Sequence, residues 1–163
     1  MASASWELVH LEPWELALGA KVGVARAAYA QANGLQNARG LAAARGAQVW
    51  ALDVVGAMAE VAVAKRLDRY WEAYVGPPTP HRPDVGLVEV RWAGPPTGHL
   101  IVPPLGDGPY VLVTGDAPDL TIHGWLDAAE ARRGDWYAEG RGPGSGAYWV
   151  PQSALRPIGE LVR

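Results

Sequence analysis

One short segment, residues 84–91, holds two carboxylates and a guanidinium group at spacings that suit metal-assisted chemistry. It reads Asp-Val-Gly-Leu-Val-Glu-Val-Arg. Glu89 and Arg91 are two residues apart, so in a β-strand their side chains point to the same face. Asp84 lies five residues before Glu89, an odd offset that would place it on the opposite face of a straight strand. A turn or bulge at Gly86 would bring all three side chains together, because glycine tolerates positive φ angles.

Such a bend would let Asp84 and Glu89 share a divalent cation. Mg²⁺ prefers oxygen ligands and usually takes one or two carboxylates together with water and substrate phosphate. Glu60 is a third candidate acid, since Ala57 and Ala64 share its face of a predicted helix and small neighbours allow close approach to a sheet. A buried glutamate without a partner is costly, which favours a functional role or a helix edge open to water. The structural alternative stays open, because acids at strand starts and Glu-x-Arg pairs on solvated faces are common.

Two helices are predicted upstream of this segment. Pro13 suits the first turn of a helix, and apolar residues then recur near the helical period over 13–32. The second helix, 52–71, contains no proline and has apolar residues at helical spacing. Two connections are also predicted: 34–46, a frayed helix or a loop, and the proline-rich 76–83, an extended segment.

Further along the chain the apolar pattern shortens and alternates, which predicts strands separated by Gly, Pro and Asp. A short helix is predicted near 126–133, and a helical turn broken by Pro157 near 153–162. The five predicted strands are 87–92, 99–102, 110–114, 120–125 and 147–150.

The order of elements predicts an α/β protein with α+β character. A central mixed β-sheet of about five strands would pack on the N-terminal helices. The 163 residues fit one domain, with a helical part at about 1–75 and a mostly β part at about 84–163.

Composition narrows the functional classes. The net charge of -3 argues against a protein that coats nucleic acid by bulk electrostatics, although one local patch could still engage it. The chain has no cysteine, which excludes disulfides, thiolate zinc sites and cysteine nucleophiles. The N-terminus lacks secretory features, and no segment is long and apolar enough to predict a membrane span, so we expect a cytoplasmic protein. Neither a phosphate-cradling glycine motif nor a His-Glu-x-x-His motif occurs.

The order of the candidate residues resembles that of the PD-(D/E)XK nuclease superfamily, the restriction-endonuclease-like fold. That signature is a Pro-Asp followed by a Glu-x-Lys on the next strand, often with a glutamate on the preceding helix. Here it corresponds to Glu60, then Pro83-Asp84, then Glu89-Val90-Arg91. The chain is also similar to small uncharacterised phage-encoded proteins, through the segments 56-GAMAEVAVAK-65, 110-YVLVTG-115, HGW and 150-VPQSAL-155.

The resemblance implies a deoxyribonuclease dependent on Mg²⁺ or Mn²⁺, acting on DNA more readily than RNA, in the host cytoplasm if a phage encodes it. Asp84 and Glu89 would be metal ligands, and Glu60 an auxiliary ligand or a group that orients through water. Arg91 would occupy the position of the catalytic lysine. Arginine stays protonated, so Arg91 suits phosphate binding but not proton transfer. Lys65 lies about 140° round the helix from Glu60 and so cannot replace that lysine.

Two alternatives belong to other functional classes. The first is a catalytically inactive relative of the nuclease fold, used by a phage as a binding or accessory protein. The second is an interaction protein that contacts another polypeptide through its tryptophans. A homodimer and a phage or host protein partner are both compatible with the sequence.

Overall fold

The computed structural model describes residues 6–35, 47–77, 79, 82–133, 135–140 and 146–162. The connection predicted at 34–46 therefore lies outside the described residues from position 36 onward, and parts of 76–83 do as well. Along the described chain the elements are β1 (Glu7–His10), α1 (Pro13–Ala32), α2 (Ala47–Leu67), β2 (Glu89–Ala93), β3 (Leu100–Val102), β4 (Pro109–Thr114), β5 (Asp119–Asp127), α3 (Ala128–Ala131), β6 (Tyr137–Ala138), β7 (Ala147–Val150), and the 3₁₀ turns η1 (Gln152–Ala154) and η2 (Ile158–Val162).

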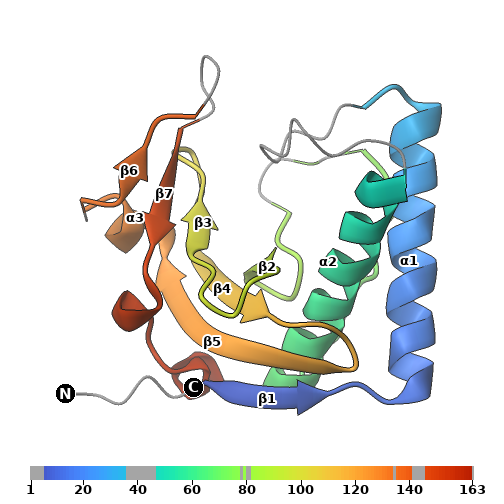
Figure 1. Cartoon of the computed structure of the whole chain (residues 1–163), viewed down its shortest axis with the longest axis horizontal. Coiled ribbons are helices and arrows are strands. Elements are labelled where there is room, and N and C mark those ends of the chain that lie inside the picture. The colour runs from blue at the N-terminus through green and yellow to red at the C-terminus, as the bar shows by residue number, and fades with distance from the viewer. Residues whose placement is uncertain are drawn as a thin grey trace.

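The protein is mixed α+β, with its described strands in two sheets (Figure 1). The larger is a four-stranded mixed sheet in the order β1-β5-β4-β2, where β2 runs parallel to β4 and the other pairs are antiparallel. The smaller has the order β3-β7-β6. The expected single sheet of about five strands was wrong, because β3 and β7 pair with each other apart from the larger sheet. Strands β1 and β6 were not predicted: β6 has only two residues, and β1 is a single short strand before the first helix whose partner, β5, lies far along the chain.

The larger sheet is covered on both faces. Helix α2 packs on one face through Ala59, Ala62 and Val63, with Val111 and Val113 of β4 beneath it. The other face meets a second apolar cluster formed with the smaller sheet and α3; its members are Leu100, Val102, Tyr110, Leu112, Leu126, Ala128, Ala131 and Val150. Burial on both faces explains why β4 reads as a continuous apolar run.

A bulge in β5 distributes this strand between the two cores. Leu112 pairs with Gly124 but the next residue, Val113, pairs with Ile122, so His123 is the extra residue. Without the extra residue, Ile122 and Leu126 would point to the same face, because they are four apart. With it, Ile122 joins the α2 core and Leu126 joins the core under the smaller sheet.

Helix α1 lies against α2 at close range. A Cβ atom added to Gly23 would come within 2.4 Å of the Val54 Cα and 2.6 Å of the Asp53 carbonyl oxygen. Only glycine permits this approach of one backbone to another. At its N-terminus α1 has a capping box between Glu12 and Glu15, and Pro13 lies between these two residues in the first turn.

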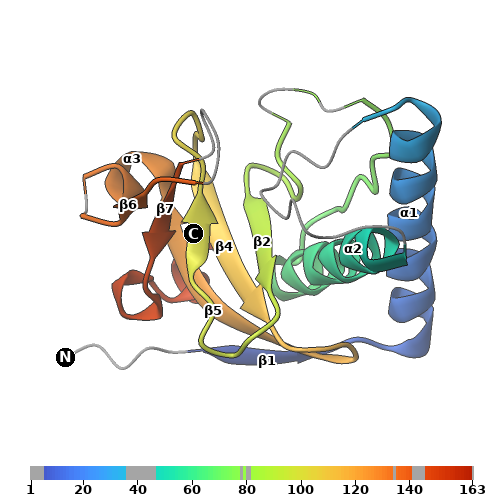
Figure 2. The ribbon, with the colours of Figure 1, turned by 45° about the horizontal axis from the view of Figure 1, so that its top comes forward.

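Among the described residues, helix α2 is long and apolar enough to cross a membrane. No such segment was expected from the sequence. Core helices of globular proteins meet the same criteria. Here α2 buries Ala59, Ala62 and Val63 against the sheet. In Figure 2, β2 lies between β4 and α2, so the strand that carries Glu89 and Arg91 borders the helix that carries Glu60.

Candidate functional site

A cleft of about 380 Å³ lies between the two helices, the segment that follows α2, and strand β2. Its described walls carry four carboxylates and three guanidinium groups. The charged lining residues are Arg26, Asp53, Glu72, Arg82, Asp84, Glu89 and Arg91, and two tyrosines, Tyr29 and Tyr74, also line it. The sequence-predicted residues Asp84, Glu89 and Arg91 are therefore brought together in one cleft.

The turn predicted at Gly86 is present and positions Asp84. Gly86 has a φ of +61°, and Val85 and Val88 close the turn by hydrogen bonds of 2.9 and 3.0 Å between their backbones. The Asp84 N–H also donates to the Val88 carbonyl, at 3.0 Å. As a result the chain reverses within four residues, and Asp84 lies beside the strand that it precedes.

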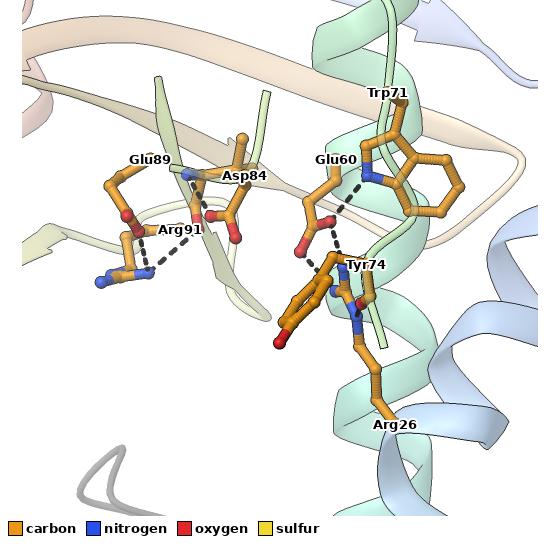
Figure 3. Close-up of polar contacts among 8 residues, drawn as sticks. Arg26, Glu60, Trp71, Tyr74, Asp84, Glu89 and Arg91 are labelled. Carbon is orange, nitrogen blue, oxygen red and sulfur yellow. Dashed lines mark hydrogen bonds and ion pairs between the residues drawn. The ribbon is translucent and has the colours of Figure 1, made fainter. Parts of the chain in front are cut away.

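The Asp84 carboxylate is tied to β2. Its Oδ2 accepts a hydrogen bond of 2.8 Å from the Val90 N–H. This bond uses one of the two carboxylate oxygens and leaves the side chain on the cleft wall (Figure 3). The carboxylate therefore has a fixed position between Glu89 and Arg91 on one side and Glu60 on the other.

Glu89 and Arg91 lie on the same face of β2, as their spacing predicts. Arg91 Nη1 lies 3.4 Å from Glu89 Oε2 and donates to the Val90 carbonyl at 3.3 Å. The Arg91 guanidinium also lies 5.1 Å from the centre of the Tyr110 ring. Both side chains are partly exposed, at 24% for Arg91 and 21% for Glu89, so each is within reach of a ligand in the cleft.

Glu60 has partners that the sequence did not predict. Its side chain is only 4% exposed and accepts two bonds from Arg26, at 2.7 and 2.9 Å, and a third from Trp71 Nε1, at 2.8 Å. Burial raises the pKa of the Glu60 carboxyl, and the charge of Asp84 adds to this; the bonds from Arg26 and Trp71 oppose the rise. Figure 3 shows Arg26 and Trp71 closing round this carboxylate, which does not line the cleft.

Arg26 connects three parts of the fold. It comes from α1, holds Glu60 of α2, and donates from Nε to the Tyr74 carbonyl at 2.9 Å. A sequence signal for it existed, because Arg26 is the one charged residue between Lys21 and Arg39. An isolated charge on a helix packed against another helix requires an acidic partner.

A second arginine, Arg82, was also missed by the sequence reasoning. It forms an ion pair with Glu72, and its guanidinium lies 3.9 Å from the centre of the Tyr74 ring. Arg82, Glu72 and Tyr74 all line the cleft. Neither lysine of the chain lines the cleft: Lys65 instead donates to the His10 carbonyl and to Glu15.

The carboxylate oxygens of the cleft suit a hard cation that also takes ligands from water and from a bound phosphate. Within the described ranges, no three His, Asp or Glu side chains are grouped closely enough to hold a metal ion. Asp84 and Glu89 together offer the one or two carboxylates that Mg²⁺ commonly takes, with water and phosphate completing its shell. Glu60 fits less well, because both of its oxygens already accept hydrogen bonds.

Comparison with known proteins returned no relatives: no family model, no curated protein and no solved structure matches this chain.

Proposed function

We propose that this chain is a metal-dependent nuclease of the restriction-endonuclease-like fold, which cleaves DNA in the cleft between α1, α2 and β2. The observation that supports the proposal best is that Asp84 and Glu89, from the two sides of one glycine turn, line the same cleft as Arg91. Asp84 and Glu89 would hold Mg²⁺ or Mn²⁺. Bound there, the ion would polarise the scissile phosphate and lower the pKa of a coordinated water.

The charges of the cleft support a requirement for a cation. Its described walls carry one more carboxylate than guanidinium groups, so a phosphodiester alone would meet net repulsion. A divalent ion between Asp84 and Glu89 would reverse the local balance, since bound ions are often the largest charges in such sites. The negative net charge of the chain points the same way.

Arg91 would hold the phosphate and stabilise the negative charge that develops on it. Its guanidinium stays protonated and presents donors in a fixed fork that matches phosphate oxygens. It cannot accept a proton, and no lysine lines the cleft to do so. Proton removal from the attacking water therefore falls to a carboxylate or to the solvent.

The test compares the wild type with Asp84→Asn and Glu89→Gln on plasmid and linear DNA, with Mg²⁺, Mn²⁺ or chelator. We expect cation-dependent cleavage by the wild type and background cleavage by both variants. Glu160→Gln is the matched control, because Glu160 is exposed and lies outside the cleft lining. Full activity in either cleft variant would contradict the proposal.

A second candidate is a catalytically inactive relative of this fold that binds DNA or a protein. The observation that favours it is the Glu60 carboxylate, whose charge Arg26 already balances. Calorimetry with Mn²⁺ separates the two candidates. The nuclease requires saturable binding that Asp84→Asn abolishes, whereas the inactive relative requires no such binding.

A further inference from the structure

Arg26 lines the cleft and has more N–H donors than its described partners use. A guanidinium has five N–H donors. Within the described part of the chain, Arg26 uses three of them, two to Glu60 and one to the Tyr74 carbonyl. The side chain is 24% exposed and lines the cleft. Two donors beyond these described contacts thus belong to a charged group that lines the cleft.

These donors are held in place. The Glu60 carboxylate accepts two parallel hydrogen bonds from one edge of the Arg26 guanidinium, and the Tyr74 carbonyl accepts a third from Arg26 Nε. Little side-chain freedom is left to lose when a ligand binds, which favours affinity. A lysine could not be oriented in this way, because its ammonium group has no plane.

Arg26 and Arg91 come from opposite walls of the cleft. Figure 3 shows Arg91 on one side of Asp84, and Arg26 with Glu60 on the other. A single phosphate beside Asp84 and Glu89 could be bound by Arg91, because Arg91 and Glu89 are on β2 and Asp84 is hydrogen-bonded to that strand. The donors of Arg26 would then face the neighbouring part of the same ligand.

We infer that the cleft binds a single nucleic-acid strand through two phosphate groups, one beside Asp84, Glu89 and Arg91 and the next against Arg26. Glu60 contributes as a positioning residue, through Arg26. The inference rests on the proposed function for the class of ligand and adds the second phosphate contact to it. The cleft volume of about 380 Å³ is near the lower end of ligand pockets, which suits one strand.

The first experiment measures binding of a labelled single-stranded DNA oligonucleotide by fluorescence anisotropy, with Ca²⁺ in place of Mg²⁺ so that binding is read apart from cleavage. Arg26→Gln should weaken binding about 10- to 100-fold, the usual effect of losing a hydrogen bond to a charged group. Arg26→Lys should recover only part of this loss. Lys21→Gln, an exposed charge on the same helix outside the cleft lining, should leave binding unchanged.

The salt dependence separates a phosphate contact from a purely structural role. Each phosphate contact adds about 0.7 to the slope of log K against log salt for single strands. Arg26→Gln should lower the slope by this amount. Replacing one phosphate at a time by a neutral methylphosphonate should identify a position that weakens binding to the wild type but not to Arg26→Gln.

Glu60→Gln tests the positioning role. It should weaken oligonucleotide binding yet leave the calorimetric affinity for Mn²⁺ unchanged, in contrast to Asp84→Asn. A drop in Mn²⁺ affinity would make Glu60 a metal ligand and overturn the positioning role. Circular dichroism checks that each variant is folded. Arg26→Gln/Glu60→Gln, which removes both charges of the ion pair, replaces Arg26→Gln or Glu60→Gln if either is not.

The outcomes separate this inference from the proposed function. If oligonucleotide binding depends on Asp84 but is the same in Arg26→Gln, with an unchanged salt slope, the second phosphate contact is wrong and the nuclease proposal stands. If the folded wild type binds no oligonucleotide with any cation, both are wrong. If Arg26→Gln binds weakly with a reduced slope while cleavage is absent, the strand contact stands and the nuclease proposal falls.

Discussion

Arg26 of α1 holds the Glu60 carboxylate of α2 by two parallel hydrogen bonds, of 2.7 and 2.9 Å. The sequence predicts that Glu60 faces a sheet and a metal ion. Instead, its charge is balanced by Arg26, which lies more than thirty residues earlier in the chain. Burial raises the pKa of Glu60, and Arg26 opposes that rise. The pair therefore joins α1 to α2 and balances the charge of the buried acid.

Replacing Arg26 by glutamine should destabilise the protein at neutral pH by about 3 to 5 kcal/mol, because it leaves a buried carboxylate without its cation. The pKa of Glu60 would rise further in this variant. A raised folded-state pKa stabilises at low pH, and that stabilisation is lost as pH rises through it. The deficit against the wild type should therefore shrink as pH falls from 7 towards the ordinary glutamate value of 4.5.

Urea unfolding at several pH values measures this deficit. Arg26→Gln/Glu60→Gln is the control, since it removes both charges and should recover stability at pH 7 relative to Arg26→Gln. A deficit that is constant with pH would show that Glu60 is not the group responsible.

Alanine should have opposite effects on stability at two glycines, Gly86 in the turn before β2 and Gly56 in α2. Gly86 has a φ of +61°, so Gly86→Ala should cost about 1 to 2 kcal/mol from backbone strain. An added Cβ would contact only the flexible Arg69 side chain, at 3.1 Å. Gly56 lies in α2 with open space beside it, so Gly56→Ala should gain up to about 1 kcal/mol. Thermal unfolding of both variants checks the signs, and equal losses would rule out the backbone explanation.

The contact between α1 and α2 predicts a large effect at Gly23. An added Cβ would overlap backbone atoms of Val54 and Asp53, which cannot move aside without separating the helices. Gly23→Ala should therefore cost about 1 to 3 kcal/mol or more, despite the higher helix propensity of alanine. At Gly19 the nearest atom belongs to the flexible Met58 side chain, at 2.9 Å, so Gly19→Ala should be milder. Chemical unfolding of the two variants ranks them, and the reverse order would contradict the assigned contact.

Acid should weaken the junction of β1, α1 and α2. Burial tends to raise the pKa of Glu15, but bonds from Lys65 and the Glu12 N–H outweigh it and hold that pKa below the usual value. A lowered folded-state pKa stabilises above the ordinary value of 4.5, and this stabilisation is lost as pH falls through the folded-state pKa. The stability advantage of the wild type over Glu15→Gln should therefore decline below pH 4.5. Parallel denaturation curves with Glu160→Gln as the control would reveal it, and an advantage that persists in acid would disprove the link.

Much of the local structure follows from the sequence. Pro13 and the spacing of apolar residues predict α1 at its observed bounds, and Gly86 with the odd offset of Asp84 predicts the turn that places both carboxylates on one cleft. These features depend on residues close together in the chain. Propensity, side-chain alternation and the special conformations of glycine are local properties, so a sequence displays them directly.

The remaining features depend on distant pairings. Arg26 and Glu60 meet only because Gly23 lets two helices pack closely, and no local pattern links an arginine in one helix to a glutamate in the next. Strand β1 pairs with β5 far along the chain, and no local pattern in its four residues shows that pairing. The extra residue at His123 places Ile122 and Leu126 in different cores, which a straight strand pattern does not reveal.

The pairing of β1 with β5 also bears on the order in which the protein can assemble during synthesis. Glu7 lies opposite Ile122, a partner 115 residues later in the chain. At about 5 to 20 residues per second, a ribosome would deliver that partner roughly 6 to 23 seconds after Glu7. The helices α1 and α2, with Arg26 and Glu60, are complete well before then. We therefore expect these two helices to pack together on the nascent chain before β1 can pair with β5.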